Sequence, residues 1–142
     1  MTLAEKELQF IERYGVFDDP QERLAAIVDR ARRAPSLPAT QRTAATRIAG
    51  CQSPVWVVAE FTGERCRFHA DAESPVVRGL VTLLCELFSG ATPADIVDFD
   101  VALLDELGLT RHLSPTRRHG LANVVAHIRT FARAHLAAAH AS

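Results

Sequence analysis

Residues 55–71 read Val-Trp-Val-Val-Ala-Glu-Phe-Thr-Gly-Glu-Arg-Cys-Arg-Phe-His-Ala-Asp, and this stretch decides the fold. Its two arms, 55–61 and 65–71, are rich in β-branched and aromatic residues, and Gly63 between them can adopt the backbone of a tight turn. In the second arm Cys66 and Phe68 alternate with polar neighbours, so their side chains face the core. The stretch predicts an antiparallel hairpin with Cys66 as a core residue.

The residues before the hairpin place another cysteine in a tight turn. They read Gly50-Cys51-Gln52-Ser53-Pro54-Val55-Trp56, and a glycine at position 50 can take a conformation closed to other residues. Just before it, 47–49 can form a short further strand, which would give a sheet of about three strands. A thiol in such a turn can be presented to a partner. From the spacing alone, a structural cysteine in a loop explains Cys51 equally well.

Apolar residues at helical spacing predict helices around this sheet. The first helix is expected at 3–14, and Asp19-Pro20 opens a second one that stops before Pro35. The helix at 76–89 is apolar almost all round, which indicates burial against the sheet. Cys85 in this helix is therefore expected to pack in the core.

The last third of the chain continues as helices. Short ones are expected at 92–97 and at 100–107, with Asp100 capping the second, and Ser114-Pro115 opens a long helix to about Leu136. Residues 137–142 are expected to be a frayed tail. The whole chain, 1–142, is predicted to be one α+β domain in which a small antiparallel sheet packs against several helices. On the long helix, the arginines expected to stay in solvent are Arg118, Arg129 and Arg133.

Length and composition argue against several classes of function. The 142 residues suffice for one buried core, and a formal net charge of −1 argues against a nucleic-acid binder, which normally has a strongly basic balance. The longest apolar stretch, near 80–84, is too short to span a membrane. Three cysteines and no secretory signal indicate a reducing compartment, so we expect the protein in the cytoplasm.

Metal and phosphate chemistry lack their usual patterns in this sequence. There is no Cys-x-x-Cys pair and no His-x-x-x-His pair, and the glycines are isolated. His119, His127 and His135 recur every eight residues and cannot share one face of a helix. We therefore expect neither a metal site nor a bound cofactor.

A nucleophilic role for Cys51 would need help from its surroundings, since an ordinary thiol is mostly protonated near neutral pH. A histidine base within hydrogen-bond reach would supply that help, and so would a nearby positive charge. The sequence does not choose among the candidates, which are His69, His112 and His119 for the base and Arg42, Arg47 and Arg117 for the charge.

Separated blocks of the chain carry a family pattern. They are Gly50 to Trp56, Val77-Arg78-Gly79-Leu80, Thr92-Pro93 with Ile96, and Leu113-Ser114-Pro115-Thr116-Arg117 followed by Gly120-Leu121. In this order and spacing, over about 23–131, the chain resembles the SufE family of sulfur-acceptor proteins in iron–sulfur cluster assembly, with CsdE as a close paralogue. It departs from the family at 71–74, where Asp-Ala-Glu-Ser stands in place of Asp-Ser-Asp-Ala.

The resemblance implies a chemistry for Cys51. The thiol would accept sulfur from the persulfide of a pyridoxal-phosphate-dependent cysteine desulfurase, SufS-like or CsdA-like, and stimulate that enzyme. It would then pass the sulfur to a cluster scaffold of the SufBCD type, acting with the desulfurase rather than as a stand-alone enzyme. The residues expected to support Cys51 or to bind the partner are Gly50, Gln52, Ser53, Trp56, Glu73, Arg78 and Arg117.

One expectation about Arg117 and two alternative functions can be tested against the structure or by experiment. Arg117 is expected either to pair with Glu73 or Asp71 or to contact the desulfurase, because a cation in the first turn of a helix opposes the helix dipole. A cysteine-dependent enzyme acting on a small substrate is one alternative function. The other is a module that activates a desulfurase by binding alone, without accepting sulfur.

Overall fold

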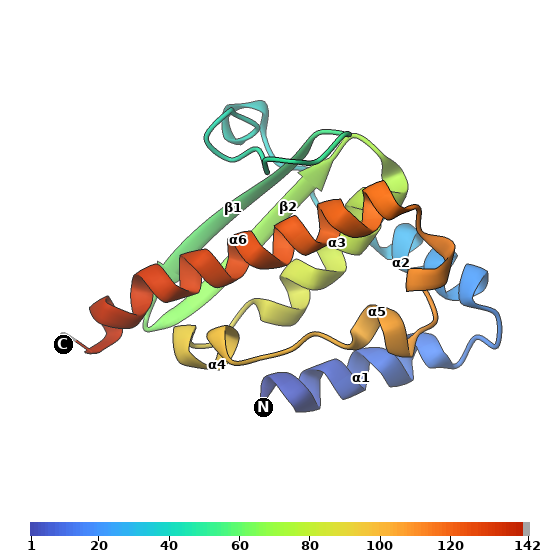
Figure 1. The fold of residues 1–142 in the computed structure, drawn as a ribbon, viewed down its shortest axis with the longest axis horizontal. Helices are drawn as coiled ribbons and strands as arrows, with labels where there is room; N and C mark the ends of the chain where they lie inside the picture. The colour runs from blue at the N-terminus through green and yellow to red at the C-terminus, as the bar shows by residue number, and fades with distance from the viewer. Residues whose placement is uncertain (141–142) are drawn as a thin grey trace.

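The computed structural model describes the backbone of residues 1–140 and the side chains of residues 1–136. The long hairpin forms one side of the molecule, α6 crosses in front of it in the view of Figure 1, and α3 packs along the second strand. The elements are α1 (Leu3–Gly15), α2 (Pro20–Arg33), the 3-10 helix η1 (Ala39–Gln41), β1 (Val55–Thr62), β2 (Arg65–Ala72), α3 (Pro75–Phe88), α4 (Pro93–Val97), α5 (Leu103–Glu106), the 3-10 helix η2 (Thr110–His112) and α6 (Pro115–His140).

The predicted hairpin is confirmed, and its register pairs Val55 with Ala72 at one end and Thr62 with Arg65 at the other. Its turn consists of Gly63 and Glu64, whose φ angles of 60° and 68° are both positive. Positive φ angles at both residues of a two-residue loop are typical of a type I′ turn, whose backbone twist matches the right-handed twist of the two strands. Glycine therefore supplies one of the two strained positions, and Glu64 tolerates the other.

The predicted α+β fold, a small antiparallel sheet packed against several helices, is confirmed, with the difference that the described sheet has two strands rather than about three. Arg47 forms a single isolated bridge with Trp56 in place of a strand. Two backbone hydrogen bonds join this segment to β1, Ile48 N–H to Val55 at 2.8 Å and Val57 N–H to Thr46 at 2.9 Å. The chain turns away again at Gly50, so the pairing has no room to extend.

The buried face of α3 forms the centre of the core, as predicted for 76–89. Leu80, Val81 and Phe88 are fully buried against β2 and the neighbouring helices. Gly79 lets α2 approach closely, because an added Cβ there would lie 3.0 Å from the Val28 backbone. Cys66 and Cys85 are buried in this core, as expected, with exposed fractions of 0% and 2%.

The expected cap of the short helix α5 is wrong. α5 begins at Leu103. The N–H groups at its start donate hydrogen bonds to the carboxylate of Glu7 in α1, from Ala102 at 2.9 Å and from Leu103 at 3.1 Å. Asp100 is therefore not needed as a cap. It forms an ion pair with Arg129 at 3.3 Å.

The long helix α6 differs from the expectation in two respects. It extends to His140, past the expected end near Leu136, and residues 141 and 142 of the expected tail lie outside the described residues. Arg129 was expected in solvent, but its side chain is 27% exposed and donates to the Phe99 carbonyl at 2.7 Å. Arg118 and Arg133 are exposed, as predicted.

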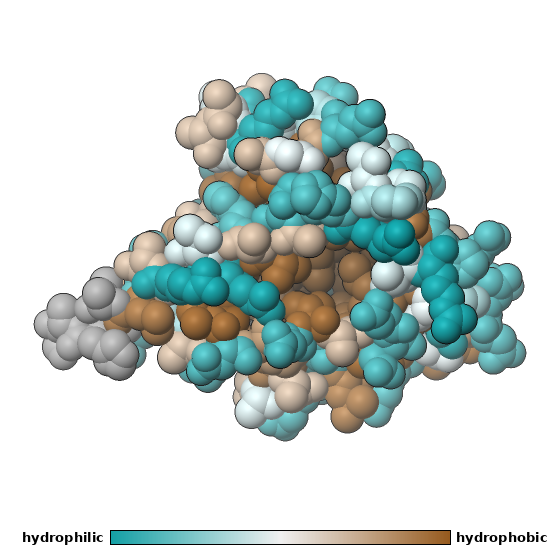
Figure 2. Space-filling model, in the orientation of Figure 1, coloured by the Kyte–Doolittle hydropathy of each residue, from teal (hydrophilic) through white to brown (hydrophobic). Residues whose placement is uncertain are grey.

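The surface beside α6 is partly apolar. Figure 2 shows apolar side chains gathered on this face around a hollow below the helix. A small cavity of about 180 Å³ between α5, η2 and α6 is lined by Leu104, Leu121 and Val125, among others. No helix in the described part of the chain combines the length and apolar character needed to cross a bilayer.

Candidate functional site

Cys51 lies in the loop before β1 and leans against the first turns of α6. Its side chain is half-buried and packs against the hydrophobic core. The thiol donates a weak hydrogen bond to the Gly120 carbonyl oxygen, with 3.7 Å between sulfur and oxygen. A Cβ at position 120 would lie 3.4 Å from the sulfur, so glycine there leaves room for the thiol beside the helix backbone.

A cavity of about 330 Å³ opens beside the Cys51 sulfur. Its volume is in the range of small-molecule sites. Core residues of α3 and α6 line it together with several hydroxyl groups. The lining residues are Cys51, Gln52, Ser53, Val55, Ser74, Val77, Val81, Ser114, Thr116, Arg117, Gly120, Leu121 and Val124.

This cavity brings together some of the predicted site residues and leaves others out. Gln52, Ser53 and Arg117 line it with Cys51. Trp56, Glu73 and Arg78 lie outside it. Among the described residues no histidine lines the cavity, so none of the three candidate bases is placed with the thiol.

The backbone at Gly50 is held by a residue that the sequence did not single out. Gly50 has φ +81°, as expected for a turn glycine, and the Asn123 side chain covers it: a Cβ at Gly50 would lie 2.5 Å from the Asn123 Nδ2. The same Nδ2 donates to the Ala49 carbonyl at 3.2 Å. Asn123 follows Gly120 by three residues, so both lie on the face of α6 that meets the cysteine loop. Its polar side chain on that face was the available signal.

The surroundings of Cys51 favour the neutral thiol. Burial raises the pKa of Cys51, and the positive charge of Arg47 lowers it by a smaller amount. Of the candidate cations, Arg47 is thus the one that acts on the thiol. Because the thiolate is the reactive form of cysteine, the thiol in this conformation is protected rather than activated.

The other two thiols are enclosed in the core. Burial raises the pKa of Cys66, and it raises the pKa of Cys85 to about 12, with a further contribution from Glu86. Neither thiol is exposed by more than 2%. Cys51 is therefore the most accessible of the three.

The expected ion pair of Arg117 with Asp71 or Glu73 is not formed, because Asp71 is already occupied. Its carboxylate lies 3.1 Å from the Arg78 Nε and accepts from the N–H groups of Leu37 and Ala72. The Nε–H does not point at the carboxylate, so this contact is an ion pair without a directed hydrogen bond. Arg78 also donates to the Ala34 carbonyl at 3.0 Å.

This buried ion pair supports the base of the cysteine loop. Asp71 lies opposite Trp56 in the hairpin, and Glu73 N–H donates to the Pro54 carbonyl at 3.2 Å. The loop therefore leaves β1 from a fixed point. The Arg42 guanidinium lies 5.8 Å from the centroid of the Trp56 ring.

Comparisons with known proteins agree with this architecture. Residues 8–132 match the SufE family model, described as an Fe-S metabolism associated domain. The chain is similar to an uncharacterized SufE-like protein of Rhizobium meliloti, with 29% identity over 135 residues that cover 92% of this chain and 96% of the relative. It is also similar to the solution structure of a hypothetical protein from Thermus thermophilus, with a TM-score of 0.75 and 22% identity over 93% of this chain and 96% of that one. The last similarity shows a common fold.

Proposed function

Since the chain belongs to the SufE family and so has a role in Fe–S metabolism, we propose that Cys51 accepts sulfur from the persulfide of a cysteine desulfurase. The observation that carries the proposal is the position of this thiol. Cys51 borders a cavity in a short loop, whereas Cys66 and Cys85 are enclosed in the core. A carrier needs one accessible thiol and no competing thiol near it.

The transfer step resembles thiol–disulfide exchange. The Cys51 thiolate attacks the outer sulfur of the desulfurase persulfide, a new sulfur–sulfur bond forms on Cys51, and the bond in the donor persulfide breaks. The donor cysteine leaves as a thiolate, so the step needs no external oxidant or reductant. The cavity beside Cys51 is large enough to shelter the added sulfur atom.

Docking of the desulfurase would have to release the cysteine loop. In the described conformation burial keeps the thiol neutral, and two contacts with α6 hold the loop: Cys51 with Gly120 and Ala49 with Asn123. A partner that draws the loop out would expose the sulfur and lower its pKa in one movement. The closed loop would then protect a persulfide until a cluster scaffold receives it. The three free thiols fit a reducing compartment such as the cytoplasm.

The residues around the cavity support this proposal in different ways. Gln52 and Ser53 would move with the loop, and Gly50 would act as its hinge. Arg117 lies at the cavity in the first turn of α6, where it can meet an acidic group of the desulfurase. Trp56, Glu73 and Arg78 would support the fixed end of the loop.

The two alternative functions make different demands. A cysteine-dependent enzyme would need a base next to the sulfur, and no histidine of the described residues lines this cavity. A module that activates by binding alone would not need the sulfur at all. Desulfurase turnover with the Cys51→Ser variant separates the carrier from the binding module. The carrier predicts loss of stimulation in a normally folded variant, and stimulation equal to that of the parent would contradict it.

A further inference from the structure

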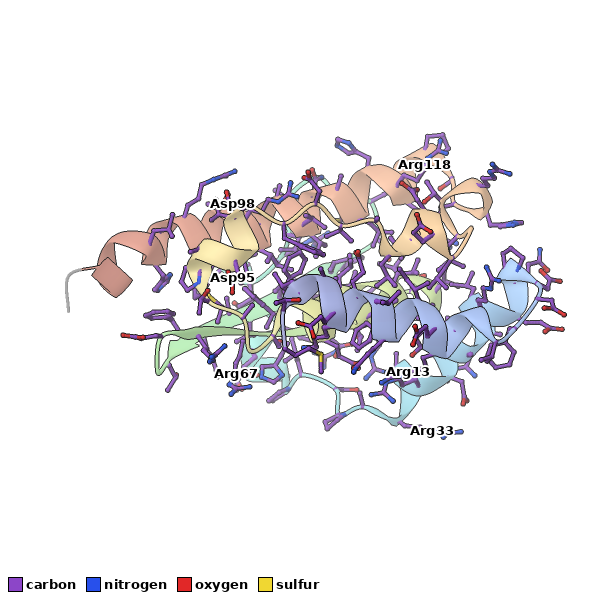
Figure 3. The ribbon with its side chains drawn as sticks, turned by 90° about the horizontal axis from the view of Figure 1, so that it is seen from below. Arg13, Arg33, Arg67, Asp95, Asp98 and Arg118 are labelled. Atoms are coloured by element: carbon purple, nitrogen blue, oxygen red, sulfur yellow. The ribbon has the colours of Figure 1, made fainter. Side chains whose placement is uncertain are left out.

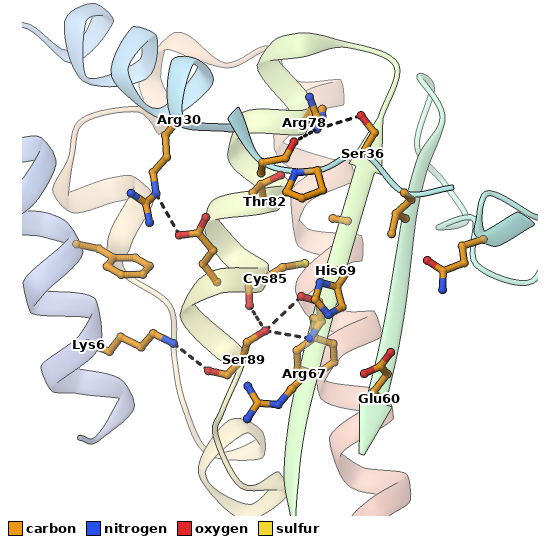
Figure 4. A pocket seen from close by; sticks show the side chains of 18 of the residues that line it. Lys6, Arg30, Ser36, Glu60, Arg67, His69, Arg78, Thr82, Cys85 and Ser89 are labelled. Carbon is orange, nitrogen blue, oxygen red and sulfur yellow. Dashed lines mark hydrogen bonds and ion pairs between the residues drawn. The ribbon is translucent and has the colours of Figure 1, made fainter. Parts of the chain in front are cut away.

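A further and larger cavity lies on a different side of α3 from the cysteine loop. It is a groove of about 890 Å³ bordered by α1, α2, the segment 34–41, β2 and α3 (Figure 4). It shares no lining residue with the cavity at Cys51. The sulfur-transfer chemistry proposed above makes no use of it.

The groove carries an excess of positive charge. Five cationic side chains line it, against the two acids Glu60 and Glu86. Arg30 pairs with Glu86 at 3.4 Å, and the partly buried Arg78 forms an ion pair with Asp71. Within the described residues, the three other cations have no carboxylate at ion-pair distance. They are Lys6, Arg13 and Arg67.

Two of these unpaired cations face each other at one end of the groove. The Lys6 ammonium donates to the Ser89 carbonyl at 2.9 Å, and Figure 4 shows the Arg67 side chain extending toward the same residue. Glu60 lies directly opposite Arg67 in the hairpin but forms no ion pair with it. Burial lowers the pKa of Lys6, the charge of Glu86 raises it, and the charge of Arg67 lowers it. Two like charges close together, one of them partly desolvated, favour an anion beside them.

The cations follow the length of the groove and do not converge on one point. In the view from below, Arg13 and Arg67 are separated along the direction of α1 (Figure 3), and Arg30 lies nearer the Arg78 end (Figure 4). A compact anion such as phosphate could contact the cations at only one end of the groove and would leave the other cations without a counter-charge. The distribution therefore fits an extended chain with several carboxylates.

The floor of the groove also offers a free piece of strand edge. Cys66, Phe68 and Ala70 share the outer edge of β2, because alternate residues point their backbone groups away from β1. The segment 89–91 already pairs with this edge at Cys66 and Phe68. The Cys66 N–H donates to the Ala91 carbonyl at 2.9 Å, and the Phe68 N–H donates to the Ser89 hydroxyl at 2.9 Å. At Ala70, which lines the groove, neither backbone group has a hydrogen-bond partner in the described part of the chain.

We propose that this groove binds an extended acidic segment of a partner protein. The backbone of the segment pairs with Ala70 at the edge of β2, and its carboxylates lie against Lys6, Arg13 and Arg67. Main-chain pairing at a free edge gives affinity, and side-chain contacts on either side give specificity. The groove would thus hold a partner while the cysteine loop on another face remains free to move.

Fluorescence anisotropy with a labelled octapeptide of alternating Glu and Thr tests this proposal. Reversing two exposed cations, in the double variant Arg13→Glu/Arg67→Glu, should weaken binding by roughly tenfold or more. The matched control Arg118→Glu/Arg133→Glu changes the net charge equally on exposed positions of α6 and should bind like the parent. Equal weakening in both double variants would show general charge attraction and overturn the proposal.

Further measurements distinguish binding of an extended segment from binding of a small anion. The same peptide with alternate N-methylated residues should bind at least tenfold more weakly, and binding of the unmodified peptide should shift the Ala70 amide resonance. Citrate that displaces the peptide at equal concentration, or N-methylation without effect, would overturn the proposal. Cys51→Ser should bind the peptide like the parent, so failure of this proposal leaves the sulfur-transfer proposal standing and vice versa.

Discussion

The Asn123 side chain on α6 donates a hydrogen bond of 3.2 Å to the carbonyl oxygen of Ala49, next to the glycine on which the cysteine loop turns. Together with the contact between the Cys51 thiol and Gly120, it fastens the loop to one face of α6. Both contacts come from the same stretch of helix. Release of the loop therefore requires that these two contacts with α6 break.

Substituting Asn123 tests how far this hydrogen bond keeps the thiol covered. Asn123→Ala should speed alkylation of Cys51 by iodoacetamide about fivefold, which corresponds to a lost hydrogen bond of about 1 kcal/mol. The rate is measured by mass spectrometry under conditions that leave the protein folded. Thr130→Ala, an exposed substitution on the same helix, is the matched control and should leave the rate unchanged. An unchanged rate in Asn123→Ala would show that the loop is held elsewhere.

The pH dependence of Cys51 alkylation tests the effect of burial on its pKa. Because burial raises the pKa of Cys51, the reaction should need a higher pH in the folded protein than in the urea-unfolded chain. Arg47→Gln removes the opposing positive charge and should move the midpoint further upward. Arg133→Gln, with the same charge change at a distant exposed position, should not move it. A midpoint lower in the folded than in the unfolded chain would refute a protected resting thiol.

The ion pair of Asp71 and Arg78 is expected to contribute to stability as well as to the loop base. Asp71 is 5% exposed and the Arg78 side chain 17% exposed, so Asp71→Asn leaves a largely enclosed guanidinium without its counter-charge. Removing one partner of a buried pair costs about 3 kcal/mol in the free energy of unfolding, and urea denaturation measures it. Asp29→Asn breaks an exposed pair with Arg33 and should cost about 0.5 kcal/mol or less. Similar costs for the two variants would mean that the buried pair has no special role.

The sequence predicted what depends on neighbouring residues. The hairpin, its turn glycine, the buried helix and the proline-marked starts of α2, α4 and α6 follow from local pattern, and the structure confirms them. What it missed depends on contacts between distant parts of the chain. Glu7 replaces Asp100 as the cap of α5 from 95 residues away, and Asn123 reaches Ala49 across 74 residues.

In the candidate site, too, local features could be predicted from the sequence, and contacts between distant parts of the chain could not. Cys51 is singled out by its turn, because a glycine and the start of a strand flank it in the sequence. The expected ion pair of Arg117 with Asp71 was wrong because the packing of α3 on β2 places Arg78 beside Asp71 instead, and the sequence pattern does not show that packing. The groove along α1 was not predicted at all, because its cations come from four separate elements.

Intact-mass analysis after incubation with a cysteine desulfurase and cysteine tests the central claim most directly, followed by peptide mapping without reductant. The account predicts that the chain gains sulfur in a form that a reductant removes, that the added sulfur maps to Cys51, and that Cys66 and Cys85 stay unmodified. Added sulfur found chiefly on Cys66 or Cys85, or none on Cys51 under conditions in which the desulfurase carries its own persulfide, would contradict it.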